Sequence, residues 1–227
     1  MFRRPPLILL CVRWYLGYNL SLRDLEEMMA ECGIRLDHST IHRWVVQLSA
    51  LLLERFNQRK QGVTSRWLLD EIYIKVRGHW MCLYRAIDSV GDTVESFFIE
   101  QLDLLAKRFI RKALKRHGQP ERIVIDGSQA NWEAITACDG ESRLQDRSRR
   151  ALNPIRTRQS PYLNNRIEQD HQRIKRRVRW MLGFKSATCA SATQGGIEMI
   201  HMMRKRQARY ADNSAPSLAE QFEILAG

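Results

Sequence analysis

The amino-acid sequence predicts an α/β fold: a mixed sheet flanked by helices, with a helix-turn-helix before it. Two observations lead to this prediction. Up to about residue 57 the apolar residues recur at the spacing of helices, whereas from about residue 66 they alternate or form short runs, as in strands. Beyond residue 100 helical and strand-like segments take turns, which is typical of parallel strands. We therefore expect a helical segment at 1–57, a sheet-containing domain at 66–210 and a C-terminal tail at 211–227.

The N-terminal segment is expected to hold three helices. Apolar spacing predicts the first helix at 7–15. Ser21, with an acid three residues later, is a typical N-cap for a second helix, and Gly33 supplies the turn that ends it. The third helix is predicted at about 39–56.

Two helices joined by a short glycine turn match a helix-turn-helix, although an ordinary helical hairpin has the same pattern. In the DNA-reading version, the start of the second of these helices faces the bases. The candidates for base contacts are therefore Thr40, His42 and Arg43.

The rest of the chain is predicted as an alternation of strands and helices. Three strands at 67–76, 80–88 and 93–99, separated by glycine turns, make an antiparallel meander. The later elements are expected in this order: a helix at 102–117, a buried parallel strand at 122–125, a short helix at 130–138, a charged loop at 140–150, a strand at 152–158, and helices at 162–181 and 187–209. Pro154 would place the last strand at a sheet edge, and the residues beyond 212 are expected to be weakly structured. This is the element order of the ribonuclease-H-like fold.

The composition favours a nucleic-acid partner. The formal net charge is +12 and the sequence pI about 9.9, which favours a polyanionic partner, although ribosomal and membrane-surface proteins share this feature. The five cysteines are scattered without a CxxC pair, which argues against disulfides and a cysteine zinc site. Free thiols are typical of a reducing cytoplasm, so we expect a cytoplasmic, nucleoid-associated protein. The apolar N-terminal stretch is short and interrupted by Arg13, so we expect no membrane span.

Three acids stand where metal ligands would be useful. Asp70 lies inside the first strand, Asp126 ends the buried parallel strand, and Glu168 lies on the helix at 162–181. Carboxylates from distant elements can converge on Mg²⁺ or Mn²⁺, and two such ions can activate an attacking oxygen and stabilise a leaving one at phosphorus. Because the chain has 25 acids, a suggestive triple also arises by chance. The competing acids are Glu71, Asp88, Asp139 and Asp170.

A basic stretch follows Glu168. At helical spacing Lys175 shares a face with Glu168, which could hold metal at one end and DNA phosphate along the rest. The stretch contains no acid, so phosphate binding is favoured over a solvated basic face. The candidate phosphate contacts are Arg173, Lys175, Arg176 and Arg179; Arg177 belongs to the same run.

Motifs spread over about residues 10 to 210 resemble the short DDE transposases of bacterial insertion sequences, specifically the IS-six family. The matching segments are VRWY at 12–15, LRDLEEM at 22–28, DHSTIHRW at 37–44, DEIYIKV at 70–76, LYRAIDS at 83–89, EQDH at 168–171, KR at 175–176 and LGFKS at 182–186.

The resemblance implies that Asp70, Asp126 and Glu168 form the DDE triad, and that Lys175 contacts DNA near the site. It also implies an enzyme that binds terminal inverted repeats, then cleaves and joins DNA strands with two Mg²⁺ or Mn²⁺ ions. We expect double-stranded DNA, both repeat and target, as partner, and a homodimer or higher oligomer on it. This chain departs from the family in a longer interval between Asp126 and Glu168, and in glycine rather than lysine after Asp126.

Three alternatives stay open at the level of sequence. Another ribonuclease-H-like integrase or nuclease would use the same triad on a different substrate. A regulator without catalysis would use only the helix-turn-helix, but would have no reason to bury acids in strands. A decayed transposase copy would fold without cutting.

Overall fold

The computed structural model describes residues 4–76, 79–99, 105–145, 153–160, 172, 175–177, 186–210 and 216–227. The chain forms two compact units. The sheet unit is Gly62–Gln172, and the helical unit joins Met1–Gln61 to Arg173–Gly227. No helix among these described residues is both long and apolar enough to cross a membrane.

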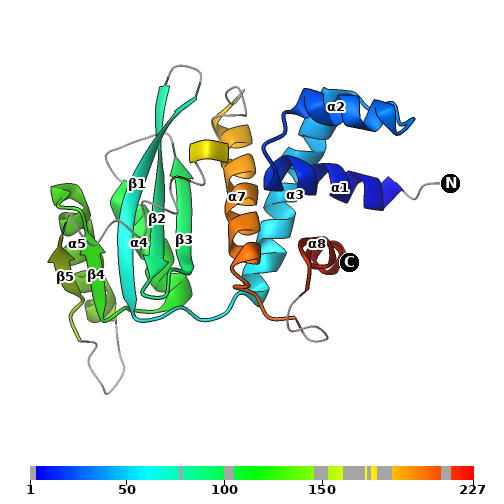
Figure 1. Cartoon of the computed structure of the whole chain (residues 1–227). Coiled ribbons are helices and arrows are strands. Elements are labelled where there is room, and N and C mark those ends of the chain that lie inside the picture. Colours follow the sequence, from blue (N-terminus) through cyan, green and yellow to red (C-terminus); the bar gives the residue numbers. More distant parts are fainter. Residues whose placement is uncertain are drawn as a thin grey trace. The chain divides into compact units, whose positions relative to one another are not determined.

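The sheet unit contains one five-stranded mixed sheet (Figure 1). Its strands are β1 (Arg66–Val76), β2 (His79–Asp88), β3 (Thr93–Ile99), β4 (Arg122–Ile125) and β5 (Arg156–Gln159), in the order β3-β2-β1-β4-β5. The first three strands pair antiparallel, and β4 pairs in parallel with both β1 and β5. An antiparallel meander, with two parallel strands added beside its first strand, is the ribonuclease-H-like arrangement, as predicted.

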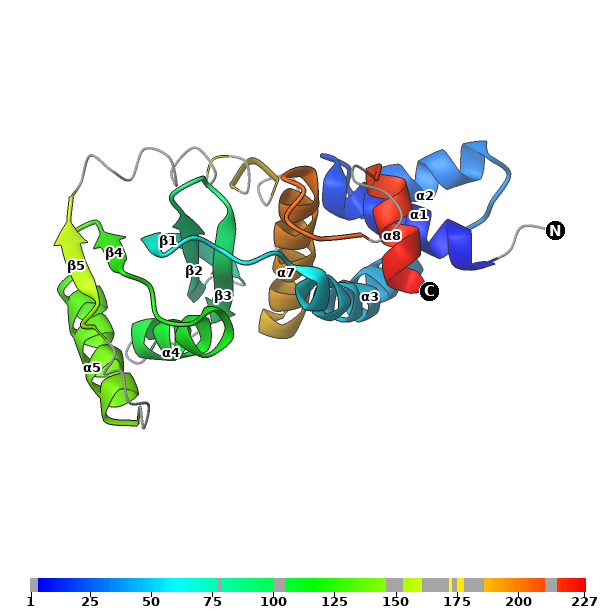
Figure 2. The ribbon, with the colours of Figure 1, turned by 90° about the horizontal axis from the view of Figure 1, so that it is seen from below.

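Two helices cover one face of this sheet, α4 (Leu105–His117) and α5 (Gln129–Gln145), which lie on the same side of the strands in Figure 2. Trp67 and Leu69 of β1 belong to the buried cluster formed with Phe109 of α4 and Ile135 of α5. Burying each such side chain contributes about 1.5–3 kcal/mol. Because side chains alternate along a strand, the residues between them, including Asp70, belong to the opposite face.

The helix α5 corrects one expectation, since it continues to Gln145 through part of the segment predicted as a charged loop at 140–150. The charge of Glu141 is satisfied by α4: its carboxylate pairs with Lys107 at 2.7 Å and with Arg111 at 2.8 Å. Because ion pairs with a neighbouring helix neutralise its charge, this stretch can continue as a helix. The strand β5 lies at a sheet edge, as predicted, but it begins at Arg156 rather than at 152, so Pro154 precedes the strand and is not the reason for its edge position.

The helical unit contains α1 (Arg4–Gly17), α2 (Leu22–Glu31), α3 (His38–Arg59), α7 (Ala187–Arg204) and α8 (Leu218–Ala226). The N-cap prediction is confirmed, because Ser21 and Asp24 form a reciprocal capping box before α2. Gly33 ends α2 with φ at +74°, a conformation that favours glycine. The three N-terminal helices therefore form as predicted.

The C-terminal helices pack with the N-terminal ones. A Cβ added to Gly196 of α7 would lie 2.8 Å from side-chain atoms of Leu16 and Ser49, so a larger residue here would force those side chains to shift. Residues 186–210, expected in the sheet-containing domain, thus fold within the helical unit. The functional division of the chain into ranges stays a prediction.

The helix α8 corrects the expectation of a weakly structured tail. Ser217 and Glu220 form a capping box at its start, and Phe222 and Leu225 are buried.

Candidate active site

Asp70 lies in β1, the central strand of the sheet. Its side chain is partly buried, and Oδ1 accepts a hydrogen bond from the Glu71 backbone N–H at 2.8 Å. The register of β1 and β2 sets Asp70 opposite Arg85, which is fully buried. Residues directly opposite in an antiparallel pair point to the same face, so a buried cation accompanies the acid.

Asp126 follows β4 directly and is exposed. Its Oδ1 accepts a hydrogen bond from the Ser128 backbone N–H at 3.3 Å, across a turn in which Gly127 has φ at +111°. The parallel register pairs Leu68 with Val124. Asp126 therefore follows the carboxyl end of the strand that pairs in parallel with β1, the strand that carries Asp70.

The charges of Asp126 and Asp70 contribute to raised pKa values of Tyr73 and Cys82, respectively. Burial, and then the hydrogen bond to Glu71, raise the pKa of Tyr73, and the charge of Asp126 adds to the effect. Burial, and then the charges of Glu71 and Asp70, raise the pKa of Cys82 to about 12. Tyr73 and Cys82 are opposite each other in β1 and β2. With that pKa, the Cys82 thiol stays protonated at neutral pH and offers no nucleophile.

Glu168, the third predicted ligand, lies outside the described residues. The convergence of three carboxylates therefore stays a prediction.

Glu71, the neighbour that competes with Asp70, points to the helix-covered face and is held there. It accepts hydrogen bonds from Tyr73 Oη at 2.8 Å and from Asn131 Nδ2 at 2.7 Å. Asn131 is buried near the start of α5, five residues after Asp126. Glu71 therefore ties β1 to the helix that follows the Asp126 turn. Strand alternation puts Glu71 on the face opposite to Asp70. Its partner Asn131 is 60 residues away, a separation that leaves no local signal in the sequence.

The predicted base contacts lie in the first turns of α3, which begins at His38 with Asp37 as its N-cap. Arg43 is exposed, and Thr40 and His42 are partly exposed. Ile41 between them is fully buried, so this end of the helix has one packed side and one accessible side. The base-reading role stays a prediction.

The turn between α2 and α3 is fixed by a small polar cluster. Glu26 accepts a hydrogen bond from the His38 backbone N–H at 3.3 Å and lies 2.9 Å from its Nδ1. One ligand atom each from Glu26, His38 and Asp37 lie within 4.8 Å of one another, a spacing that suits a metal ion. Each already joins or caps the two helices, so we assign the cluster a structural role.

Of the predicted phosphate contacts, Lys175 and Arg176 are helical and exposed. Arg173 and Arg179 lie outside the described residues. Arg177, from the same basic run, is buried: its Nη2 donates to the Tyr15 carbonyl and, at 3.3 Å, to the Leu20 carbonyl. The run is therefore not a uniform solvent-facing surface, a feature that the sequence analysis missed.

Comparison with known proteins supports the resemblance. A family model described as a DDE domain matches residues 64–207. The chain is 34% identical over 204 residues to the transposase for insertion sequence-like element IS431mec of Staphylococcus aureus, covering 89% of this chain and 86% of the relative. The transposase for insertion sequence element IS257 in transposon Tn4003, also from Staphylococcus aureus, matches over the same shares at 34% identity.

Solved structures give a weaker likeness. The catalytic core domain of HTLV-2 integrase in complex with magnesium, in its dimeric form, is 14% identical with a TM-score of 0.37, over 51% of this chain and 70% of that one. A chain of a simian T-cell lymphotropic virus intasome, in complex with a PP2A regulatory subunit, gives 14% identity and a TM-score of 0.40, over 60% and 49%. At these scores the likeness adds nothing to the family comparison.

Proposed function

The chain belongs to the DDE transposases of bacterial insertion sequences, in the IS-six family, and from this premise we propose that it binds terminal inverted repeats and catalyses metal-dependent DNA cleavage and strand transfer. The observation that supports the proposal is that Asp70 lies in β1 and that Asp126 directly follows β4, the strand paired in parallel with β1. One acid is partly buried and the other exposed, so both a fixed ligand and open access are available.

The residues fit the metal that this chemistry needs. Asp70, Asp126 and Glu168 would hold Mg²⁺ or Mn²⁺, because carboxylate oxygens are the ligands these ions prefer. The exposure of Asp126 leaves room for water and phosphate oxygens beside it. When bound, two such ions activate an attacking oxygen and stabilise the leaving oxygen at phosphorus. Water attacks first at the repeat end, and the freed 3′-hydroxyl then attacks target DNA.

The helical unit supplies DNA recognition in this proposal. Thr40, His42 and Arg43, at the start of α3, would read the repeat in a major groove, as recognition helices do. The exposed bases Lys175 and Arg176, with Arg173 and Arg179, would contact phosphates and supply affinity rather than sequence preference.

The assembly and its cellular place follow from the reaction. Two repeat ends and a target must be held together, so the protein would act as a homodimer or higher oligomer on DNA. We place it in the cytoplasm at the nucleoid, where its substrate is.

The test is Asp70→Asn in the full chain, assayed with Mg²⁺ on duplexes that carry the repeat ends. We expect cleavage and strand transfer to be lost while DNA binding is retained, because the change removes a metal ligand and no phosphate contact. Asp92→Asn, in the β2–β3 turn, is the matched control and should cleave like the wild type. Cleavage by Asp70→Asn at the wild-type rate would refute the triad assignment.

A further inference from the structure

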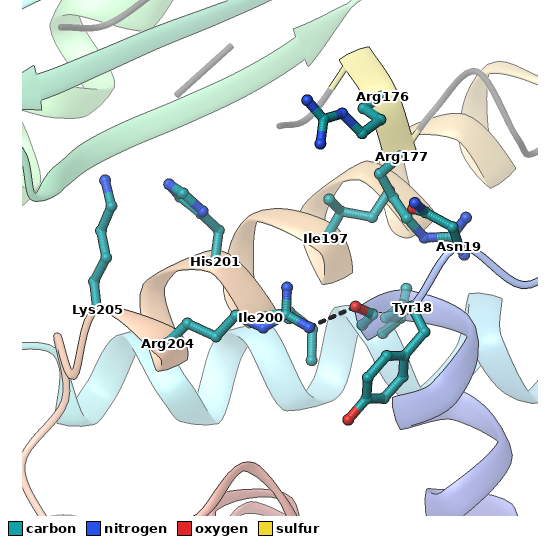
Figure 3. Close-up of a pocket in the computed structure, with 11 residues that line it drawn as sticks. Tyr18, Asn19, Arg176, Arg177, Ile197, Ile200, His201, Arg204 and Lys205 are labelled. Atoms are coloured by element: carbon teal, nitrogen blue, oxygen red, sulfur yellow. Dashed lines mark hydrogen bonds between the residues drawn. The ribbon is translucent and has the colours of Figure 1, made fainter. Parts of the chain in front are cut away.

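A pocket of about 420 Å³ in the helical unit is lined by basic side chains. Its walls come from the end of α1 and the turn after it, from residues 176–177, and from α7 (Figure 3). Its basic members are Arg176, Arg177, His201, Arg204 and Lys205, and none of the described residues that line it is acidic. The volume lies in the range of ligand pockets, so the pocket can admit a molecule rather than a single water.

Arg177 is the buried member of this pocket, with a side chain only 5% exposed. One guanidinium nitrogen, Nη2, donates to the carbonyls of Tyr15 and Leu20, and the group lies 5.1 Å from the centre of the Tyr15 ring. Within the described part of the chain, Nε and Nη1 have no hydrogen-bond partner. Buried charged donors without acceptors are costly, so the arrangement favours an anion beside them.

Arg204 brings a second guanidinium to the pocket from α7. Its Nη2 donates to the Gly17 carbonyl at 2.5 Å, and the group lies 5.9 Å from the centre of the Tyr18 ring (Figure 3). A carbonyl holds the side chain in place without neutralising its charge. Burial lowers the pKa of Arg177 to about 10, which still leaves that side chain charged at neutral pH.

We propose that this pocket binds a phosphate group of the DNA backbone, with Arg177 as its buried anchor and Arg204 as a second contact. That this phosphate group belongs to DNA rests on the proposed function. Guanidinium groups match phosphate oxygens in shape and charge, and Arg176 at the pocket leads into the basic run at 173–179. Free inorganic phosphate shares this chemistry and is the competing source.

A phosphate held here would position DNA relative to the helix-turn-helix. Arg177 and Arg204 bond to carbonyls at the end of α1 and in the turn before α2. The same two side chains would then bind both a DNA phosphate and the backbone carbonyls of the segment that precedes the helix-turn-helix. Such a contact fixes the register of the protein on DNA without reading its sequence.

The experiment uses the full chain in EDTA, so that no cleavage takes place. Affinity for a fluorescent random-sequence duplex is measured between 50 and 200 mM salt for the wild type, Arg177→Gln and Arg204→Gln. The slope of log affinity against log salt is negative, and each lost phosphate contact should make it shallower by about 0.9. Between 50 and 200 mM salt, the affinity of such a variant should therefore fall by a factor roughly 3-fold smaller than that of the wild type. Arg209→Gln, an exposed arginine of the same unit outside the pocket, is the control and should keep the wild-type slope.

A second measurement separates the two sources of phosphate. Inorganic phosphate, compared with chloride at equal ionic strength, should raise the Tm of the wild type and the control more than that of the pocket variants. Equal stabilisation of all four proteins by inorganic phosphate would overturn the proposal that this pocket binds a phosphate group. Lost stabilisation with unchanged salt slopes would assign it to free phosphate and overturn DNA as the occupant.

Two features keep the outcome decisive. If Arg177→Gln does not fold, the exposed Arg204→Gln decides both measurements. Because binding is measured without metal, a chain that binds through the pocket but never cleaves would contradict only the proposed function.

Discussion

The two units of the molecule hold their basic side chains in different ways. In the sheet unit, four bases of α4 are neutralised by carboxylates. Glu95, only 6% exposed, pairs with Lys112 at 3.2 Å and with Arg116 at 3.0 Å. The Glu141 carboxylate joins two further bases of α4 in the same manner.

In the helical unit, arginines are instead held by backbone carbonyls. Arg55 donates to the carbonyls of Leu225 at 2.6 Å and Ala226 at 2.9 Å, at the end of α8. Arg177 and Arg204 donate to carbonyls at the end of α1 and just beyond it. The carbonyl end of a helix attracts cations through its dipole, so these contacts position the side chains.

The difference shows where the positive charge of this chain remains available. A base paired with a carboxylate contributes little to the attraction of a polyanion. A base held by a carbonyl keeps its full charge in a fixed position. The net charge of +12 therefore says less about DNA binding than the way each base is held.

The largest effect on stability is expected from truncating Phe222, the buried aromatic side chain of α8. Phe222 is 1% exposed, so Phe222→Ala should lower the free energy of unfolding by about 3–5 kcal/mol. It would also loosen the carbonyls that hold Arg55. Urea unfolding measures the change, and Ile224→Ala, 40% exposed on the same helix, should change stability by less than about 0.5 kcal/mol. Equal effects of the two variants would mean that α8 does not support the helical unit.

A smaller effect is expected from Glu95 in the sheet unit. Glu95→Gln removes a buried carboxylate from its bases and should lower the free energy of unfolding by about 2 kcal/mol. Glu121→Gln is the control, because that carboxylate is 46% exposed and its two pairs, with Arg66 and Arg156, are both at 3.9 Å. A change no larger than in the control would show that carboxylate pairing does not hold this unit together.

Asn131 tests how the sheet unit places its acids. Asn131→Ala removes the bond from α5 to Glu71, so the turn that carries Asp126 should lose support. We expect the cleavage rate at saturating DNA to fall about tenfold, equal to about 1.4 kcal/mol, with DNA affinity unchanged. Gln129→Ala, whose bond to Glu133 is exposed, should leave the rate unchanged. A wild-type rate for Asn131→Ala would limit this bond to a role in folding.

The sheet and the face of Asp70 could be predicted from the sequence, because strand alternation is a local signal. Dense β-branched and aromatic residues mark β1 to β3, and the apolar run before Asp126 marks β4. The strand order β3-β2-β1-β4-β5 needed more than local pattern, because the pairing of β1 with β4 joins strands that are far apart in the sequence.

The features that the sequence analysis missed depend on partners far along the chain. Glu141 reads as part of a charged loop until its pairs with Lys107 and Arg111, about thirty residues earlier, are known. Arg177 reads as one more base in a run, because its burial depends on carbonyls more than 150 residues away. Contacts of this separation leave no periodic trace in the sequence.

The smallest expected effects concern Lys175 and Arg176, and they sharpen the comparison of positioned with dispersed charge. Both side chains are exposed, so each should contribute about one phosphate contact to the salt slope. On the helix predicted at 162–181, Lys175 would share a face with Glu168, whereas Arg176 would lie about 100° further round. Lys175→Ala should therefore lower the single-turnover cleavage rate as well as binding, and Arg176→Ala should mainly lower binding.

Two measurements on both variants separate these roles: affinity against salt, and single-turnover cleavage of saturated DNA. A phosphate next to the one being cut can influence the rate only if its contact is held in the reacting geometry. Wild-type cleavage by Lys175→Ala on saturated DNA would make Lys175 part of a general basic surface. Equal rate losses in the two variants would show that the helix face does not decide which base acts at the site.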